Sequence, residues 1–152
     1  MMVVVFILTR KLSFSKRIAL SLLLPYIFLV FASTVFDRTR DEEVWGVFRP
    51  FRSYKEIFKG TELGEYLKGE VALNIIMLAP VGIFVPIIVK RKKVLKAALT
   101  ALTISTTIEV LQILTKRGYL EFDDIFNNTL GAIIAALFTI LVMSVIDAFK
   151  RS

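Results

Sequence analysis

The sequence predicts an all-α, polytopic membrane protein: a bundle of four transmembrane helices, with an extracytoplasmic loop between the first and second helices. Three observations predict this fold. The 152 residues are 56% hydrophobic and have a mean hydropathy of +0.70, whereas soluble domains are nearer to ~45–50% apolar. Four apolar segments approach or reach the ~20 residues that a helix needs to cross a bilayer. Short basic segments flank them, as is typical of segments that stay in the cytoplasm.

The first segment, residues 1–17, is short, mixed and basic, with Arg10, Lys11, Lys16 and Arg17. Its apolar run, residues 2–8, is too short to cross a membrane. We interpret residues 1–17 as a cytoplasmic or interfacial N-terminus. The first span is expected at about 18–36, which carries no charge and contains Pro25, a residue that membrane helices tolerate.

Residues 37–70 form the long loop, with seven Lys or Arg and eight Asp or Glu. It contains the only tryptophan, Trp45, and the motif F-R-P-F-R at residues 48–52. A short interfacial helix is predicted here, with one face made of apolar and aromatic side chains: Tyr54, Ile57, Phe58 and Leu63.

The remaining spans are expected at about 71–89, 94–114 and 125–146, followed by a cytoplasmic tail at 147–152. Pro80, Gly82 and Pro86 make the second span prone to a kink or to local unwinding. The basic run Lys90–Lys93 leaves room only for a tight turn before the third span. Residues 18–146 together form the predicted transmembrane domain.

Orientation follows from the short segments. The N-terminus, residues 90–96 and the C-terminus carry eleven Lys or Arg between them, whereas the 115–124 turn is net acidic. The positive-inside rule therefore predicts a cell-membrane protein with both termini in the cytoplasm. The long loop and the acidic turn are expected outside.

Polar residues gather near the predicted outer ends of the last three spans. The sequence has one Gln and three Asn, and all four lie there. Ser105, Glu109 and Gln112 share one helical face of the third span, because steps of three or four residues return to the same side. In the fourth span, Asp124, Asn128 and Gly131 share a face in the same way. Since a tight turn joins these spans, we expect the two faces to oppose each other and to meet Asn74.

An isolated ionised carboxylate at mid-bilayer costs ~2.5–3.5 kcal/mol on insertion scales. Glu109 therefore needs a partner, water or a proton, and Arg117 is expected to neutralise Asp123 or Asp124. Two interpretations stay open: the polar residues only hold the helices together, or they line a functional pocket.

The chain contains no Cys and no His. This composition excludes disulfides, histidine triads and histidine-based zinc sites. Any acid or base must be a carboxylate, Lys or Tyr.

The motifs resemble those of the VanZ-like family of small bacterial membrane proteins. The resemblance rests on F-R-P-F-R-S-Y at 48–54, N-x5-P-x-G-x3-P at 74–86 and S-x3-E-x2-Q at 105–112. It rests also on the acidic and amide stretch from Arg117 to Gly131, where Asp124, Asn128, Thr129 and Gly131 fit the family pattern best. The resemblance implies a cell-envelope role, with a link to low-level resistance to teicoplanin, and it implies no settled enzymatic activity.

We expect an outward-facing polar pocket that takes a lipid-linked or amphipathic ligand, such as a cell-wall precursor or a lipoglycopeptide. The expected partners are this ligand and membrane lipids, with no nucleic acid, no resident metal and no cofactor. A carboxylate-dependent enzyme with Glu109 and Asp124 as catalytic groups, with or without a divalent cation, is one alternative. A structural subunit of a membrane complex is another. The candidate ligand-binding residues are Asn74, Ser105, Glu109, Gln112, Arg117, Asp124, Asn128, Arg49 and Arg52.

Overall fold

The computed structural model describes residues 1–37, 50–118 and 120–151. Its helices are α1 (Met2–Leu8), α2 (Phe14–Phe31), the π-helical turn η1 (Ala32–Phe36), α3 (Arg52–Lys59), α4 (Glu62–Met77), α5 (Ala79–Ile88), α6 (Lys93–Leu114) and α7 (Phe122–Phe149). Within these ranges there is no strand. Four helical segments are long and apolar enough to cross a membrane: Phe14–Phe36, Glu62–Ile88, Lys93–Leu114 and Phe122–Phe149. The predicted all-α fold with four spans is therefore confirmed.

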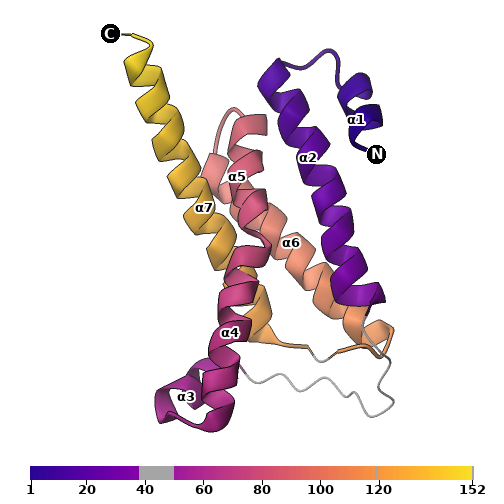
Figure 1. The fold of residues 1–152 in the computed structure, drawn as a ribbon, viewed down its shortest axis with the longest axis vertical. Coiled ribbons are helices and arrows are strands. Elements are labelled where there is room, and N and C mark those ends of the chain that lie inside the picture. The colour runs from indigo at the N-terminus through magenta and orange to yellow at the C-terminus, as the bar shows by residue number, and fades with distance from the viewer. Residues whose placement is uncertain (38–49, 119, 152) are drawn as a thin grey trace.

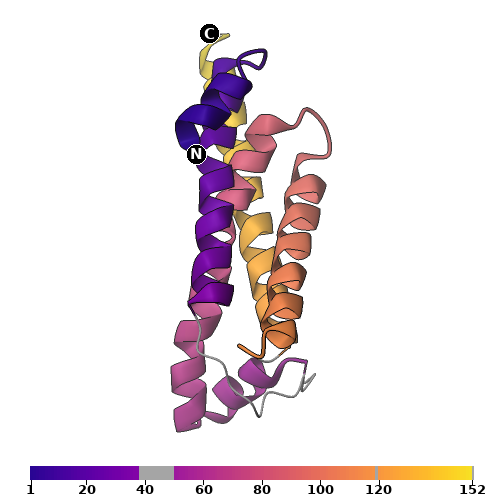
Figure 2. The same ribbon diagram turned by 90° about the vertical axis from the view of Figure 1, so that its right-hand side faces the viewer.

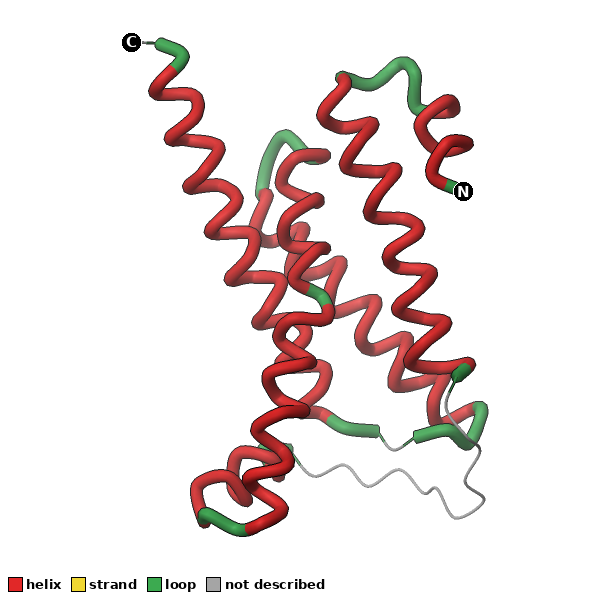
Figure 3. The backbone as a smooth tube through the Cα atoms, viewed as in Figure 1, coloured by secondary structure: helices red, strands yellow, loops and turns green. Residues whose placement is uncertain are grey.

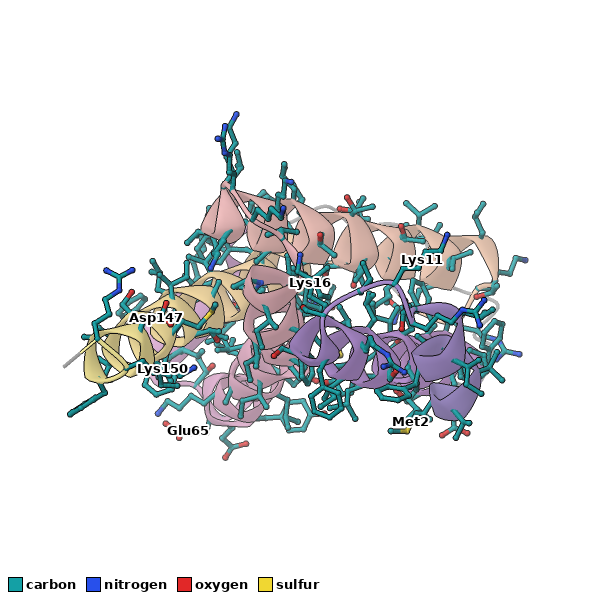
Figure 4. All side chains as sticks on the ribbon, turned by 90° about the horizontal axis from the view of Figure 1, so that it is seen from above. Met2, Lys11, Lys16, Glu65, Asp147 and Lys150 are labelled. Atoms are coloured by element: carbon teal, nitrogen blue, oxygen red, sulfur yellow. The ribbon has the colours of Figure 1, made fainter. Side chains whose placement is uncertain are left out.

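The four spans run alternately up and down (Figure 1). Both termini and the turn between α5 and α6 lie at one end, and α3 and the turn between α6 and α7 lie at the other (Figures 1 and 3). Figure 4 looks onto the first end, where the labelled Lys11 and Lys16 accompany the N-terminal helices and Lys150 accompanies α7. We call this the basic end, and the opposite one the α3 end.

The second span is broken at Leu78, as the prolines predict. Helix α4 stops at Met77, and α5 begins at Ala79 with Pro80 in the first turn of α5. Backbone N–H groups in a first turn have no partner within the helix, so the missing N–H of proline costs no hydrogen bond there. The Tyr26 hydroxyl donates to the carbonyl of Met77 at 2.5 Å, so α2 satisfies an acceptor that the break releases. Leu78 and Val81 are fully buried, which places the break in the core.

Two glycines set the distance of α7 from the second span. A Cβ at Gly131 would lie 1.8 Å from the carbonyl oxygen of Ile75, and a Cβ at Gly82 would lie 2.1 Å from that of Ala132. Neither position has room for a side chain, so the backbones of α4, α5 and α7 approach more closely than larger residues would permit.

The long loop differs from its predicted form at one boundary. Helix α3 ends at Lys59 with Gly60 as its C-cap, whose φ of 67° is left-handed, and α4 begins already at Glu62. Leu63 therefore lies on α4 rather than on the same helix as Tyr54. Thr61 caps α4 by accepting a hydrogen bond from the Gly64 N–H at 3.0 Å, and the acidic residues of the first turn favour a helix start.

The N-terminal helix α1 packs against the start of α2. The Arg17 side chain donates to the carbonyl of Phe6 and lies 3.7 Å from the centre of the Phe6 ring. Val3 and Leu8 remain largely exposed, so α1 presents apolar side chains outward at the basic end.

Candidate functional site

At the α3 end, side chains of α4 and α7 meet through an amide and a carboxylate. The Nδ2 of Asn74 donates to Oδ1 of Asp124 at 2.6 Å. This bond orients the Asn74 amide, with its nitrogen toward α7. It joins two residues that are 50 positions apart in sequence.

Helices α6 and α7 are joined by a second polar contact deeper in the bundle. The Nδ2 of Asn128 donates to Oγ of Ser105 at 2.9 Å, and the exposed fractions of these residues are 2% and 1%. The predicted opposition of the two polar faces is therefore present at this position.

Glu109 links α6 to the start of α7. It is only 3% exposed, and its Oε2 accepts a hydrogen bond from the backbone N–H of Glu121 at 2.8 Å. Glu121 is the residue that precedes the first turn of α7, where backbone N–H groups have no partner within the helix. The buried carboxylate thus holds the end of the turn between the two spans.

Gln112 and Arg117 bind the end of the first span. The Nε2 of Gln112 donates to the carbonyl of Thr34 at 2.9 Å. Arg117 donates to the carbonyl of Val35 at 3.2 Å and to that of Phe36. Helix ends expose unpaired carbonyls and carry negative partial charge, which explains this placement. Arg117 therefore contacts the end of the first span, and its expected neutralisation of Asp123 or Asp124 stays a prediction.

A second polar row of α7 holds α3 in place. The two oxygens of Asp123 accept the backbone N–H groups of Phe51 at 2.5 Å and Ser53 at 2.8 Å. One turn further along α7, Asn127 accepts a hydrogen bond from the Tyr54 hydroxyl. Phe51 has a left-handed φ of 59°, a conformation that costs a non-glycine residue roughly 1–2 kcal/mol, so these contacts stabilise a strained turn.

Burial against α7 raises the pKa of the Tyr54 phenol above its ordinary value, and the nearby Asp123 carboxylate adds to the rise, while the hydrogen bond to Asn127 partly offsets it. The phenol therefore stays protonated and continues to donate at physiological pH.

Two cavities with shared lining residues open beside these contacts. The inner cavity, about 300 Å³, is lined by Tyr66, Glu70, Leu73, Asn74, Gln112, Glu121 and Asp124. The outer cavity, about 370 Å³, is lined by Arg52, Ser53, Leu63, Tyr66, Leu67, Glu70, Leu120, Glu121, Phe122 and Asp123. Tyr66, Glu70 and Glu121 border both cavities, so we treat the two as one groove.

The predicted site residues fall into three groups. Asn74, Gln112 and Asp124 line the inner cavity, and Arg52 lines the outer one. Four other predicted residues do not line either cavity and instead make the contacts described above: Ser105, Glu109, Arg117 and Asn128. Arg49 lies outside the described residues.

Glu70, Tyr66 and Glu121 line the groove but were not among the predicted site residues. Glu70 and Tyr66 belong to a face of α4 with steps of three and four residues, from Leu63 to Asn74. Because the predicted second span starts at residue 71, residues 63–70 were assigned to the loop and this helical periodicity was missed. In the described part of the chain, no three acidic residues are grouped so that they could hold a metal ion.

A comparison with protein-family models identifies the family of this chain. The sequence model of the family described as VanZ/LLP1 matches residues 3–143. This match includes residues of all four spans and every residue that lines the groove. No curated protein and no solved structure matches the chain.

Proposed function

The chain belongs to the VanZ/LLP1 family and is a multi-pass membrane protein, and from this premise we propose that it binds the polar part of an amphipathic or lipid-linked ligand at the cell envelope. The groove at the α3 end is the proposed binding site. The positive-inside rule supports an outward-facing groove and cytoplasmic termini in the cell membrane.

One observation carries the proposal. Three separate spans contribute Asn74, Gln112 and Asp124 to the lining of one cavity. Polar side chains within spans are expensive unless they have partners or a ligand pathway. Here they border an open volume of about 300 Å³, which is the lower end of the size range of ligand pockets.

The geometry divides the candidate residues by role. In the proposal, Asn74, Gln112 and Asp124 contact the ligand, while Arg52 meets a phosphate or carboxylate. Ser105 and Asn128 bond to each other, which supports a role in holding α6 against α7.

Binding is preferred to the catalytic alternative because of Glu109. A general acid or base must reach the substrate within about 3 Å. Glu109 is buried, does not line the groove, and holds the Glu121 N–H with its Oε2.

The test is binding of a lipid-linked cell-wall precursor, or of a lipoglycopeptide, to purified protein in detergent. Asn74→Ala should weaken binding about tenfold, the loss of one or two hydrogen bonds to the ligand. Thr103→Ala is the matched control, because Thr103 is exposed on α6 and its hydroxyl bonds only to the carbonyl of Leu99. Unchanged binding by both Asn74→Ala and Gln112→Ala would remove the groove as the site.

A cellular assay tests the link to resistance. Expression of the wild-type chain should reduce susceptibility to a teicoplanin-type antibiotic, and Asn74→Ala should abolish the reduction while membrane levels stay equal. Equal protection by both proteins would contradict a role for the groove in resistance.

A further inference from the structure

We infer that α3 carries a second site, an aromatic hollow that takes the upper part of an acyl chain of an anionic phospholipid, whose phosphate pairs with Lys55. The hollow has a volume of about 370 Å³ and is lined by Phe51, Tyr54, Lys55, Phe58 and Phe126. It shares no lining residue with the groove. The inference therefore goes beyond the proposed function and does not depend on it.

One face of α3, with the residue before it, supplies four of the five lining residues. Phe51, Tyr54, Lys55 and Phe58 follow steps of three and four positions, which return to the same side of a helix. The fifth, Phe126, lies one turn inside the membrane-spanning helix α7. The hollow therefore lies where the end of a span meets α3.

Aromatic packing forms the hollow before any ligand arrives. The Phe51 ring meets Tyr54, Phe122 and Phe126 edge-on, with ring centroids 6.2, 5.3 and 5.7 Å apart, which is the range of favourable aromatic pairs. Phe51 keeps this ring although its backbone is left-handed, a conformation that glycine adopts without penalty. The wall is therefore fixed, and a ligand that enters has little to reorganise.

The position of α3 indicates the membrane as the source of the ligand. Figures 1 and 2 both show α3 beyond the lower ends of α2 and α6, which belong to two of the four spans. This position corresponds to the headgroup level of the bilayer. Phe58 is 88% exposed, the largest fraction among the large apolar side chains of the described residues. Aromatic side chains at this level contact lipid, so a lipid is the occupant that covers the Phe58 ring.

Charge selects among lipids. Lys55 lines the hollow and forms no ion pair with any residue that the structure describes. Lys59, one turn further along α3, is paired with Glu56 at 2.8 Å. Asp123 lines the groove rather than the hollow, and its two oxygens accept backbone N–H groups at the start of α3. The described lining of the hollow thus has one cation and no carboxylate, which complements a phosphate with net negative charge.

A choline lipid fits this hollow less well. Aromatic rings also attract quaternary ammonium groups, but the positive charge of Lys55 repels such a group. The bilayer surrounds every acyl chain with apolar neighbours, so burial of the chain gives no preference between lipids. The preference comes from the headgroup, and one lysine near the membrane surface supplies about fivefold in favour of an anionic lipid.

Photolabelling of the full chain in phosphatidylcholine vesicles tests the site. The probe is phosphatidylglycerol with a diazirine in the upper part of one acyl chain, and peptide mass spectrometry locates the label. We expect label on Phe58 or Phe126, and the same diazirine on phosphatidylcholine should label them about fivefold less. Val110, exposed on the last turns of α6, is the internal reference and should be labelled equally by both probes.

A variant pair locates the anion. Lys55→Gln should remove the preference for the phosphatidylglycerol probe at the hollow. Lys59→Gln is the matched control, because it removes the same charge from the same helix at a residue that pairs with Glu56 and lines none of the described cavities. It should keep the fivefold preference. If Lys55→Gln fails to fold, the comparison of the two probes on the wild-type chain still decides the question.

Four outcomes overturn the inference. Equal labelling of the hollow by both probes would leave no role for Lys55. Stronger labelling by the phosphatidylcholine probe would make the hollow a choline site. A preference that survives in Lys55→Gln would place the partner of the phosphate elsewhere. Absence of label, with crosslinks between two copies of the chain at α3, would assign the hollow to a protein contact. The binding assay for the groove uses another ligand and other residues, so either proposal can fail alone.

Discussion

Adjacent residues at the start of α7 serve different neighbours. Consecutive positions on a helix point about 100° apart, so Asp123 faces the backbone of α3 while Asp124 faces Asn74 on α4. The next turn repeats the division, because Asn127 meets Tyr54 and Asn128 meets Ser105. Each doubled residue in the sequence D-D-x-x-N-N therefore has its own structural reason.

Asp123 is expected to be the main attachment of α3. Asp123→Ala would leave the backbone N–H groups of Phe51 and Ser53 without their acceptor, and each unsatisfied buried donor costs about 1–3 kcal/mol. Hydrogen exchange of the α3 amides should become at least tenfold faster, while exchange in α6 stays unchanged. Glu65→Ala, an exposed change on α4, should leave α3 protected. Unaltered protection in Asp123→Ala would show that other contacts hold the helix.

Tyr54 makes this attachment sensitive to alkaline pH. Its pKa is raised in the folded protein by burial and by Asp123. Folding therefore favours the neutral phenol. The stabilisation is fully present below the ordinary tyrosine pKa of ~10 and is lost as the pH rises through the folded-state value. The difference in tyrosinate absorbance between the native protein and Tyr54→Phe should report the ionisation of Tyr54, and it should rise only at a pH above the ordinary tyrosine pKa of ~10. A Tyr54 that ionises at or below its ordinary pKa would contradict the burial argument.

At the scale of elements, the second span and α7 pack with their backbones in close contact. Gly131 and Gly82 allow the carbonyls of Ile75 and Ala132 to approach, and the bundle has no flexible side chain there that could move aside. The small residues that the sequence shows in the fourth span therefore mark an interface with α4 and α5, in addition to the polar one with α6.

Gly131→Ala is predicted to destabilise the bundle by about 1–3 kcal/mol or more, the usual penalty of overpacking. The thermal midpoint in detergent should fall clearly. Gly69→Ala is the matched control, since a Cβ at Gly69 meets nothing within 4 Å and alanine raises helix propensity by about 1 kcal/mol. Equal midpoints for the two variants would contradict the proposed close contact.

Sequence patterns predicted the elements unevenly. The prolines correctly indicated the break at Leu78, because proline removes a backbone donor wherever it occurs. The boundary between α3 and α4 was missed, since capping by Thr61 extends α4 into a charged segment that hydropathy assigns to a loop. The π-helical turn η1 has no local signature, and its carbonyls are bound by Gln112 and Arg117, which are distant in sequence.

At the scale of the molecule, the alternation of the spans puts both termini on the side of the Lys90–Lys93 turn (Figure 1). We expect this side to be cytoplasmic. The chain contains no cysteine, so single replacements at Arg91 and Lys116, both exposed, can be labelled without background. A membrane-impermeant maleimide should label Lys116→Cys in intact cells and Arg91→Cys only after permeabilisation. The reverse pattern would invert the proposed orientation and place the groove inside.

The candidate site was predictable where it depended on helical faces. Steps of three and four residues grouped Glu109 with Gln112, and the short turn between α6 and α7 implied that Ser105 and Asn128 would oppose each other, as their bond shows. Which residues line open space could not be read in this way. Glu109 and Asn128 are buried and do not line the cavity, because lining depends on how the helices pack in three dimensions and not on a local sequence pattern.

The length of α7 relates the protein to the thickness of its membrane. Its 28 residues extend about 42 Å, compared with a hydrocarbon layer of about 30 Å. A helix of this length accommodates the excess by tilting or by protruding from the bilayer. Asp124 lies at its first turn, so a change of lean in a thinner or thicker bilayer would move one wall of the groove relative to α4.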